Sequence, residues 1–506
     1  MTGEGHEIGA AGGEPARADA RWGADSVFLL VATVAVLIAR IPVMAVRFFD
    51  QDELEHAHAA WSVFRGLLPY RDFFEHHTPW YYYALAPFFR LFAVDQSFAS
   101  ASHFLSFARG LSLALTALSA VLVYRIGRIA RIGSLGANRR AGLLAALFLV
   151  GLPVVIQKTL EIRPDVPALP FFLAGLWFLL RGLGARQDSS PLRLRWFLGG
   201  GLCLGASIMC TQKALFILPG AFAGLGVWAL AGGRGALRGR ILAVLMALVG
   251  VAVPFLATWA AFAVQGGGAQ FIHHNFLLNA KWRMHSGRHI QKVLATSWPI
   301  VALGLVGAAA AVVRFHRARQ RQWGDVLLLC TLGGLVAGLL VVPAAYRQYY
   351  LMPLPIVCVF AAQGLGVLVD RARGRSRAWL VVGAAAVFLV WPVVDLAASF
   401  SRRDERQIAR LRYVFDHTAP TDTVLDGWMG TAVFRPHPDY YFFMHGELRV
   451  MLSEAEKDAY VDALESGRVR PSLITLDDEL AAMGPRFMRF VRSNYVSDDG
   501  LFYRRR

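Results

Sequence analysis

Cysteine is scarce in this sequence: there are four cysteines in 506 residues, and no two of them form a C-x-x-C pair. Each lies within an apolar run, where a thiol serves as a small buried hydrophobic group rather than as a disulfide partner or metal ligand. Redox chemistry is therefore not expected. The four are Cys203, Cys210, Cys330 and Cys358.

Charged side chains are also few, at 17% of the residues against 56% hydrophobic. The net charge of +17 does not come from one basic patch, because the arginines recur in clusters between apolar segments. Such clusters indicate membrane topology, and no nucleic-acid partner is expected. The sequence also has no glycine-rich loop in a strand–turn–helix context, so a nucleotide-sugar donor is not supported.

Long apolar runs dominate instead. The mean hydropathy is +0.44, and the runs are long enough to cross a bilayer as helices. The sequence predicts a polytopic α-helical membrane protein with about eleven transmembrane helices within 26–397, preceded by a short disordered cytoplasmic tail at 1–25 that lacks a signal-peptide cleavage site. The expected spans are 26–46, 104–124, 141–157, 166–180, 196–210, 214–231, 241–264, 296–313, 326–342, 351–369 and 378–397.

Arginine clusters set the expected orientation. They follow the second, fourth, sixth, eighth and tenth spans, and arginine-rich loops stay on the cytoplasmic side of the membrane. The N-terminus is then cytoplasmic, and the loops after odd-numbered spans lie on the extracytoplasmic side. The expected location is the cell membrane, that is, the inner or plasma membrane.

Residues 398–506 differ in composition from the rest, with 16 Lys+Arg against 17 Asp+Glu and apolar runs of strand length. They predict a small extracytoplasmic α/β domain. Two of its segments, 427–430 and 435–441, combine aromatic and polar residues. These segments could bind a carbohydrate acceptor or simply pack between strand and loop. The expected strands are 423–427 and 473–476, and the expected helices are 402–417, 454–465 and 478–491.

The long first extracytoplasmic loop, 47–103, holds a dense polar cluster: six carboxylates and four histidines lie within 50–79. Directly after an apolar span, such a cluster is costly unless it faces water or performs chemistry. A helix over 52–66 would place Asp52, Glu55 and His56 on one face. The aromatic stretch 80–89 is typical of a helix at the membrane interface.

The first motif lies in this loop and has two parts, which are Asp52-Glu53 and the run Gly66-Leu67-Leu68-Pro69-Tyr70-Arg71-Asp72-Phe73-Phe74-Glu75-His76. They resemble the first-loop signature of GT-C glycosyltransferases, in particular the subgroup with protein O-mannosyltransferases and lipid A aminoarabinose transferases. The resemblance implies transfer of a sugar from a polyprenyl-phosphate carrier to an acceptor hydroxyl on the extracytoplasmic side, with inversion at the anomeric carbon.

The resemblance also implies roles for single residues. Asp52 would be the general base or acceptor-positioning carboxylate, and sugar transfer needs such a group near the acceptor hydroxyl. A solvated loop is the plainer alternative for this aspartate. The other residues of this loop that are expected to bind substrate are Glu53, Arg71, Asp72, Glu75 and His76. Asp72 and Glu75 could instead order the loop.

A second motif, Glu161-Ile162-Arg163-Pro164-Asp165, resembles an Arg-Pro-Asp turn whose carboxylate faces the same cavity in the family. This implies that Asp165 is a second catalytic carboxylate and that Arg163, with Lys158 as a weaker candidate, contacts phosphate. Helix capping explains Asp165 as well, because a proline and an acidic residue are both favourable in a first helical turn.

A third motif, Tyr346-Arg347-Gln348-Tyr349-Tyr350-Leu351-Met352-Pro353, resembles sequences that place an arginine on the donor phosphate. Arg347, with Tyr346 beside it, would take this part, because a guanidinium binds phosphate oxygens through two parallel hydrogen bonds. An interfacial arginine among tyrosine anchors is the alternative.

One position departs from the family pattern. Many relatives have Lys-Pro-Pro where this chain has His77-Thr78-Pro79, and a histidine supplies charge only when protonated. Either His77 does so beside the phosphate, or Lys281 or Arg283 takes over that charge. The latter two belong to the loop 265–295, which is basic and has no acidic residue.

No cofactor is expected and no metal ligands are assigned. The histidines of His56-Ala57-His58 and His76-His77 leave a zinc site open as a less favoured alternative. It is disfavoured because histidines two apart on a helix, such as His56 and His58, point to different faces and no cysteine joins them. The subgroup is also regarded as metal-independent. A divalent ion held by Asp52 and Asp165 with waters stays open.

The expected function is transfer of a hexose or pentose from a polyprenyl-phosphate donor to a glycan, lipid or protein acceptor. A transporter or flippase of lipid-linked sugars is the main alternative. Transporters usually carry internal repeats and ionisable residues near mid-membrane, whereas the polar residues here gather at the outer boundary. A structural assembly subunit is a third interpretation, disfavoured because all three motifs occur together.

Overall fold

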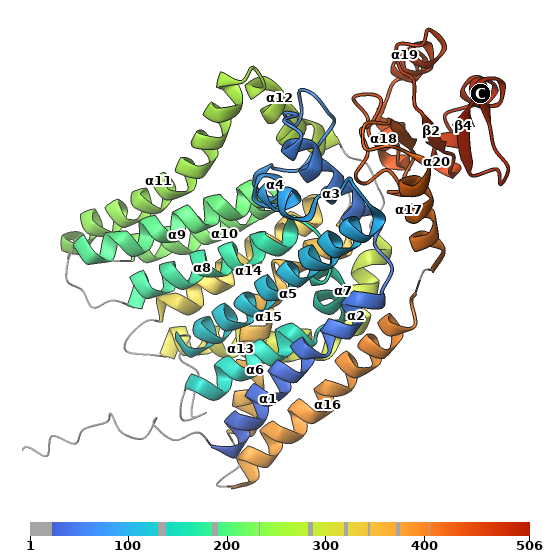
Figure 1. Ribbon diagram of the computed structural model, residues 1–506. Coiled ribbons are helices and arrows are strands. Elements are labelled where there is room, and N and C mark those ends of the chain that lie inside the picture. The colour runs from blue at the N-terminus through green and yellow to red at the C-terminus, as the bar shows by residue number, and fades with distance from the viewer. Residues whose placement is uncertain are drawn as a thin grey trace, which may run out of the picture.

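The computed structural model describes residues 23–129, 138–184, 191–231, 233–281, 287–317, 322–342, 345–370, 375–403 and 405–506. Figure 1 shows long helices side by side in a bundle, with a small part of helices and strands at one end. The helices are α1 (Ala24–Ile38), α2 (Arg40–Val46), α3 (Gln51–Phe64), α4 (Trp80–Phe92), α5 (Phe98–Ile129), α6 (Asn138–Gly151), α7 (Pro153–Thr159), α8 (Asp165–Gly184), α9 (Pro191–Cys210), α10 (Ile217–Leu230), α11 (Arg234–Val264), α12 (Gly268–Ile272), α13 (Gly287–Arg317), α14 (Trp323–Val341), α15 (Leu354–Val369), α16 (Arg375–Phe400), α17 (Glu405–His417), α18 (Gly446–Met451), α19 (Glu454–Glu465), α20 (Asp478–Ala481) and α21 (Pro485–Asn494). Short helical turns are η1 (Gln212–Phe216), η2 (His273–Leu278), η3 (Asn279–Lys281) and η4 (Arg347–Leu351).

Eight helices of the described residues are long and apolar enough to cross a membrane. A ninth crossing results if α6 and α7 form one span, and α9 and α15 contain shorter apolar helices. All eleven predicted spans therefore coincide with a helix or a bent pair, which confirms a multi-pass helical membrane protein. The number of crossings stays a prediction, as does the side each loop faces. Of the predicted tail at 1–25, residues 1–22 lie outside the described residues, and α1 already begins at Ala24.

The bend between α6 and α7 measures 65°. Pro153 causes it, because proline has no N–H and its ring clashes with the carbonyl four residues earlier in a continuous helix. The bend turns α7 and the segment after it, which carry Lys158, Glu161 and Arg163, toward the polar end of the bundle.

Glycines allow the closest helix contacts of the bundle. The pair α13 and α15 meets at Gly307 and Gly364, where an added Cβ would fall on the backbone of the facing helix. The pair α9 and α11 meets in the same way at Gly201 and Gly250. Small residues favour helix association in lipid because they let two backbones approach and gain packing contacts.

The helix α3 begins and ends where its sequence requires. Asp50 and Glu53 form a capping box at its start, which satisfies the first backbone N–H groups. After its end, Gly66 takes a left-handed conformation with φ of 89°, which favours glycine. Tyr70 also has a positive φ, 69°, and its hydroxyl donates to the carbonyl of His77 at 2.6 Å. The segment after α3 is thus folded back toward the helix.

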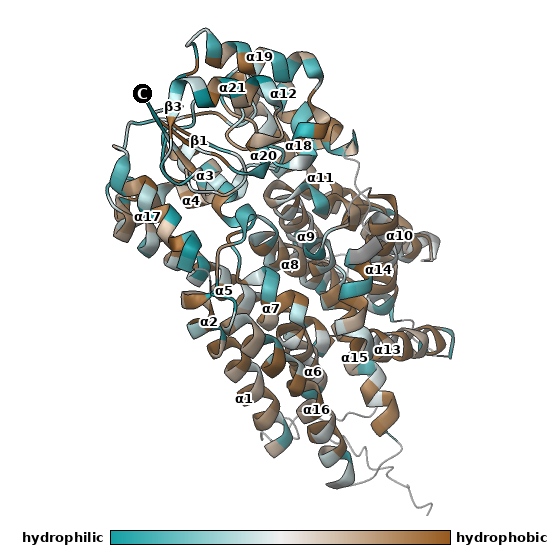
Figure 2. Cartoon of the chain, turned by 90° about the vertical axis from the view of Figure 1, so that its right-hand side faces the viewer, coloured by the Kyte–Doolittle hydropathy of each residue, from teal (hydrophilic) through white to brown (hydrophobic). Residues whose placement is uncertain are grey.

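The C-terminal part contains a mixed four-stranded sheet in the order β1-β2-β4-β3. The strands β1 and β2 are parallel with Leu425 opposite Ile474, and β4 runs antiparallel to both β2 and β3. The sheet and its helices share one hydrophobic cluster with α3, α4 and the start of α5. Figure 2 shows the change from the brown helices of the bundle to a mixed, more hydrophilic C-terminal part. The strands are β1 (Val424–Asp426), β2 (Leu473–Thr475), β3 (Tyr495–Val496) and β4 (Phe502–Arg505).

Both predicted strands of this part are present, and α17 and α19 occupy the predicted helical segments. The prediction of one continuous helix over 478–491 was wrong. The segment forms α20 and α21, because Gly484 takes φ of 108° and Pro485 starts a new helix, a position that suits proline.

We predict that Gly364→Ala lowers the thermal unfolding temperature of the detergent-purified protein. The new methyl group meets the backbone of α13, and overpacking of this kind costs about 1–3 kcal/mol. Gly383→Ala in α16, where a Cβ would meet nothing within 4 Å, is the matched control and should leave the unfolding temperature unchanged or slightly higher. Equal shifts in the two variants would contradict close packing of α13 on α15.

Candidate active site

A cavity of about 740 Å³ opens at the polar end of the bundle. Its wall comes from α3, the segment before α4, the turns after α7, α9 and α14, the segment 275–280, His289 of α13, and the C-terminal part. The bundle residues all lie at or beside connections that follow odd-numbered predicted spans. They therefore lie at the end opposite the arginine-rich connections.

The guanidinium of Arg163 is the centre of the charge pattern. It is almost fully buried, and its Nη1 lies 2.6 Å from Asp52 Oδ2 and 3.0 Å from Glu161 Oε2. Two further carboxylates lie slightly beyond: Asp50 Oδ1 is 3.9 Å from Nη1, and Asp165 Oδ2 is 3.8 Å from Nε. These carboxylates hold the pKa of Arg163 well above its ordinary value despite the opposing effect of burial.

Asp50 and Asp52 are the carboxylates of this group that line the cavity, and Asp52 is the more exposed, with 31% of its side chain exposed against 23% for Asp50. Burial raises the pKa of Asp52, but the charges of Arg163 and Lys158 outweigh that effect and hold the pKa below its ordinary value. Asp52 is therefore ionised at neutral pH. The predicted face of Asp52, Glu55 and His56 is present, and all three line the cavity.

Glu53 points away from the cavity and is fully buried. It accepts two hydrogen bonds from Arg109, at 2.9 and 2.7 Å, and one from the backbone N–H of Ile162 at 3.1 Å. The expected contribution of Glu53 to donor binding therefore has no support in the geometry. Its contacts join α3, α5 and the turn before α8.

Asp165 also lies behind the cavity wall and not on it. It is the first residue of α8 and is buried against Lys213, whose Nζ is 3.2 Å from both carboxylate oxygens. Lys213 itself lines the cavity. Because Arg163 contacts both Asp52 and Asp165, a guanidinium occupies the place that a divalent ion shared by these two carboxylates would take.

Arg347 and Tyr346 both line the cavity, as predicted. Arg347 Nη1 donates to the side-chain oxygen of Gln157 at 2.9 Å. Tyr346 donates to Glu447 of the C-terminal part at 2.7 Å. A hydrogen bond from His445 holds the pKa of Glu447 down at about 2, so this carboxylate is ionised as well.

His76 and His77 line the cavity, and Glu75 lies buried beside them. Glu75 Oε1 accepts from the backbone N–H groups of both histidines and lies 3.0 Å from His77 Nδ1. Burial, followed by the charge of Lys213, lowers the pKa of His77 to about 3. His77 is therefore neutral at physiological pH. The lysines of the described cavity wall are Lys158 and Lys213.

The remaining predicted residues lie elsewhere. Arg71 and Asp72 form an exposed ion pair with each other at 2.7 Å, and Asp72 also accepts from the N–H of Leu68, so it orders the loop. Lys281 is exposed outside the cavity wall. Arg283 lies outside the described residues.

Comparison with known proteins adds to this geometry. A family model described as dolichyl-phosphate-mannose-protein mannosyltransferase matches residues 76–259. No curated protein sequence matches significantly. Among solved structures, ArnT from Cupriavidus metallidurans in the apo state superposes with a TM-score of 0.67 at 12% identity, over 95% of this chain and 98% of ArnT. The same protein bound to undecaprenyl phosphate gives 0.64 at 13% identity, over 94% and 96%.

The oligosaccharyltransferase of Archaeoglobus fulgidus in the apo form also matches, with a TM-score of 0.57 at 11% identity, over 90% of this chain and 69% of that one. The chain therefore shares its overall fold with these proteins. The chain has the GT-C glycosyltransferase fold. The resemblance to this group that the three motifs indicate is confirmed at the level of the fold.

Within this GT-C fold, the two aromatic and polar segments of the C-terminal part, 427–430 and 435–441, make different contacts. Trp428 lines the cavity, whereas Gly430 packs on Leu54 of α3. In the second segment, Arg435 is buried and bonded to the backbone of Asp95 and Thr418, and Tyr440 donates to the carbonyl of Tyr70. The segment 435–441 therefore attaches the C-terminal part to the first loop.

Several residues that line the cavity or contact its wall were not predicted from the sequence. Lys213 had a usable signal, because a single lysine at the start of an apolar span is a functional candidate by default. Glu161 belonged to a recognised motif but had been given no part. His445 and Glu447 have no local signal, since only the packing of distant segments brings them to the cavity. Gln157 has none either, and it accepts from Arg347 without lining the cavity itself.

We predict that Glu53→Gln destabilises the protein strongly, although Glu53 does not reach the GT-C cavity. The variant leaves the buried Arg109 without its carboxylate, and breaking a buried ion pair costs about 3–5 kcal/mol. Thermal unfolding in detergent measures the loss. Arg71→Met breaks the exposed pair with Asp72 and should shift the unfolding temperature little. A Glu53→Gln variant as stable as the parent would contradict the structural assignment.

Proposed function

We propose that this protein is a membrane glycosyltransferase that transfers a hexose or pentose from a polyprenyl-phosphate carrier to an acceptor hydroxyl on the extracytoplasmic side. One observation carries the proposal: the cavity presents an ionised carboxylate, Asp52, together with a cation, Arg347, that pairs with no carboxylate among the described residues. A transfer from phosphate to a hydroxyl needs these two groups.

The donor phosphate is assigned to Arg347. The other basic side chains of the described cavity wall already have acidic partners: Lys158 pairs with Asp50 and Glu161, Arg163 with Asp52 and Glu161, and Lys213 with Asp165. Among the described residues, Arg347 forms no ion pair and donates to the neutral amide of Gln157. An anion entering the cavity therefore gains most at Arg347, where it displaces no carboxylate.

The carrier is assigned from the fold and its relatives. The ArnT structure contains undecaprenyl phosphate, and a structure of the A. fulgidus oligosaccharyltransferase AglB contains dolichol-phosphate. The apolar helices around the cavity suit a carrier whose lipid chain stays in the membrane. The identity of the sugar and of the acceptor is not specified by these features.

The proposed reaction is a single displacement. The acceptor oxygen attacks the anomeric carbon from the face opposite the phosphate, the bond between that carbon and the phosphate oxygen breaks, and the configuration inverts. The acceptor proton passes to Asp52. Because Arg163 holds the pKa of Asp52 low, this carboxylate is a weak base that accepts a hydrogen bond at first and takes the proton only as the new bond forms.

Arg347 has its main effect late in this reaction. Negative charge develops on the phosphate as the sugar leaves, so a cation fixed beside it stabilises the transition state more than the bound donor. Asp165 has a positioning role in the proposal, since it holds Lys213 at the cavity wall.

A transporter or flippase of lipid-linked sugars remains the second candidate. The cavity opens at one end of the bundle, and its charges lie at helix ends and in connections, which favours an enzyme at the membrane surface. Proteoliposomes containing a labelled polyprenyl-phosphate sugar separate the two. Transfer of label to an acceptor supports the enzyme, whereas movement of the intact donor between leaflets without transfer supports the transporter.

We predict that Asp52→Asn lowers the rate of transfer by about 10²- to 10⁴-fold, because the amide cannot accept the proton. The assay uses a panel of polyprenyl-phosphate monosaccharides, labelled in the sugar, with cell-envelope extract as the source of acceptor. Donor binding should survive. Asp72→Asn, an aspartate of the same loop outside the cavity wall, is the control. Undiminished transfer by Asp52→Asn would exclude this aspartate as the base.

We predict that Arg347→Ala lowers kcat/KM for the donor by about 10- to 100-fold, through both a lower kcat and a higher KM, the equivalent of ~1.5–3 kcal/mol for a charge-assisted hydrogen bond. Arg347→Lys should recover part of the loss. Lys281→Ala removes an exposed cation outside the cavity wall and should leave kcat/KM for the donor unchanged. If Lys281→Ala weakened the donor and Arg347→Ala did not, the phosphate would bind at the basic loop instead.

A further inference from the structure

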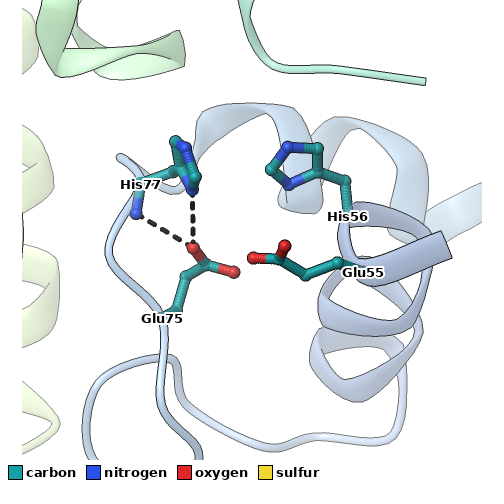
Figure 3. Close-up of side chains that lie close together, drawn as sticks. All are labelled: Glu55, His56, Glu75 and His77. Carbon is teal, nitrogen blue, oxygen red and sulfur yellow. Dashed lines mark hydrogen bonds and ion pairs between the residues drawn. The ribbon is translucent and has the colours of Figure 1, made fainter. Parts of the chain in front are cut away.

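Four side chains beside the cavity form a compact group. Glu55 and His56 come from α3, and Glu75 and His77 come from the segment before α4. One ligand atom from each lies within 4.8 Å of the others, and all four residues are buried. Figure 3 shows the two carboxylates facing each other, with the imidazole rings of His56 and His77 beside them.

Two oxygens of this group have no hydrogen-bond partner. They are Glu55 Oε1 and Glu75 Oε2, both inaccessible to solvent. A buried carboxylate oxygen without a partner has lost its hydration and gained no hydrogen bond in return, which is energetically unfavourable. Two such carboxylates side by side also repel each other, so they must share either a proton or a cation.

The two histidines fit the second solution. His77 Nδ1 lies 3.0 Å from Glu75 Oε1, and His56 Nδ1 lies 3.0 Å from the hydroxyl of Tyr82. His77 Nδ1 is the ring nitrogen that faces the carboxylates, as the dashed line in Figure 3 shows. It is therefore the ligand atom of that ring, and a bound ion would take the place of its hydrogen bond to Glu75. His56 also offers one ring nitrogen to the group.

We propose that Glu55, His56, Glu75 and His77 bind a zinc ion. Imidazole nitrogens and carboxylate oxygens are both ordinary zinc ligands, whereas magnesium and calcium favour sites made of oxygens alone. The four ligand atoms must move together on binding, because ligands of a tetrahedral zinc ion with bonds of 2.0–2.2 Å lie roughly 3.4 Å apart. An entry path exists, since Glu55, His56 and His77 line the cavity.

The ion is structural in this proposal. Its two positive charges balance the two carboxylates, and four protein ligands close its coordination. It joins α3 to the segment before α4. Because Glu55 and His56 lie one helical turn after Asp52, the ion also fixes the helix face that presents Asp52 to the cavity.

Metal content tests the proposal independently of transfer activity. The full-length protein is purified in detergent with a tag that contains no histidine, stripped with a chelator, exposed to zinc sulfate and freed of unbound ion by gel filtration. Mass spectrometry of the metal should find about one zinc per chain, and zinc should raise the unfolding temperature because it binds only the folded protein.

The double variant Glu55→Gln/Glu75→Gln should retain no zinc and lose the zinc-dependent rise in unfolding temperature. It removes the repulsion between the carboxylates, so it should fold at least as well as the metal-free parent. His58→Gln is the matched control, because His58 is buried on the same helix and contacts His437 outside the group. This variant should keep the ion.

Cobalt gives a second readout. The cobalt form of the parent should show the visible absorption bands of a tetrahedral ion, and the double variant should not. A parent protein that retains no zinc would overturn the proposal in favour of a proton shared by Glu55 and Glu75. Equal zinc in the parent and the double variant would overturn it in favour of an adventitious ion elsewhere.

Discussion

The cavity depends on one buried guanidinium. Arg163 has been removed from water almost completely, and an isolated charge in such a place would be very costly. The cost is offset because carboxylates from two segments surround it: Asp50 and Asp52 from the start of α3, and Glu161 and Asp165 from the turn between α7 and α8. The same contacts hold these segments together as one wall of the cavity.

The surrounding charges extend this pattern into a balanced network. Arg47, Arg109, Lys158, Arg163 and Lys213 face Asp50, Asp52, Glu53, Glu161 and Asp165. The network carries no net charge, so its function is to order the wall rather than to attract an anion. Arg347 lies outside this network and pairs with no carboxylate among the described residues. In the proposed function, this separation lets a site built from so many acidic groups bind an anionic donor.

Hydrophobic period and charge made much of this fold predictable. Each long apolar run forms a helix, and the three motifs that contain Asp52, Arg163 and Arg347 meet at one cavity. What could not be predicted was the direction of individual side chains within a motif. Glu53 and Asp165 belong to recognised motifs, yet both turn toward buried cations. The local sequence does not contain Arg109 or Lys213, so it cannot indicate that these carboxylates will be paired.

The C-terminal part shows a similar limit of prediction from sequence. Its strands were legible from the sequence, but its relation to the cavity was not, because Trp428, His445 and Glu447 reach the cavity only through packing of the sheet against α3 and α4. The bundle supplies most of the charged wall, while this part adds an aromatic ring, an imidazole and one carboxylate. The bond from Tyr346 to Glu447 joins the two walls next to Arg347. A cavity with the described shape therefore requires both parts of the chain, and residues 398–506 belong to the site as much as the first loop does.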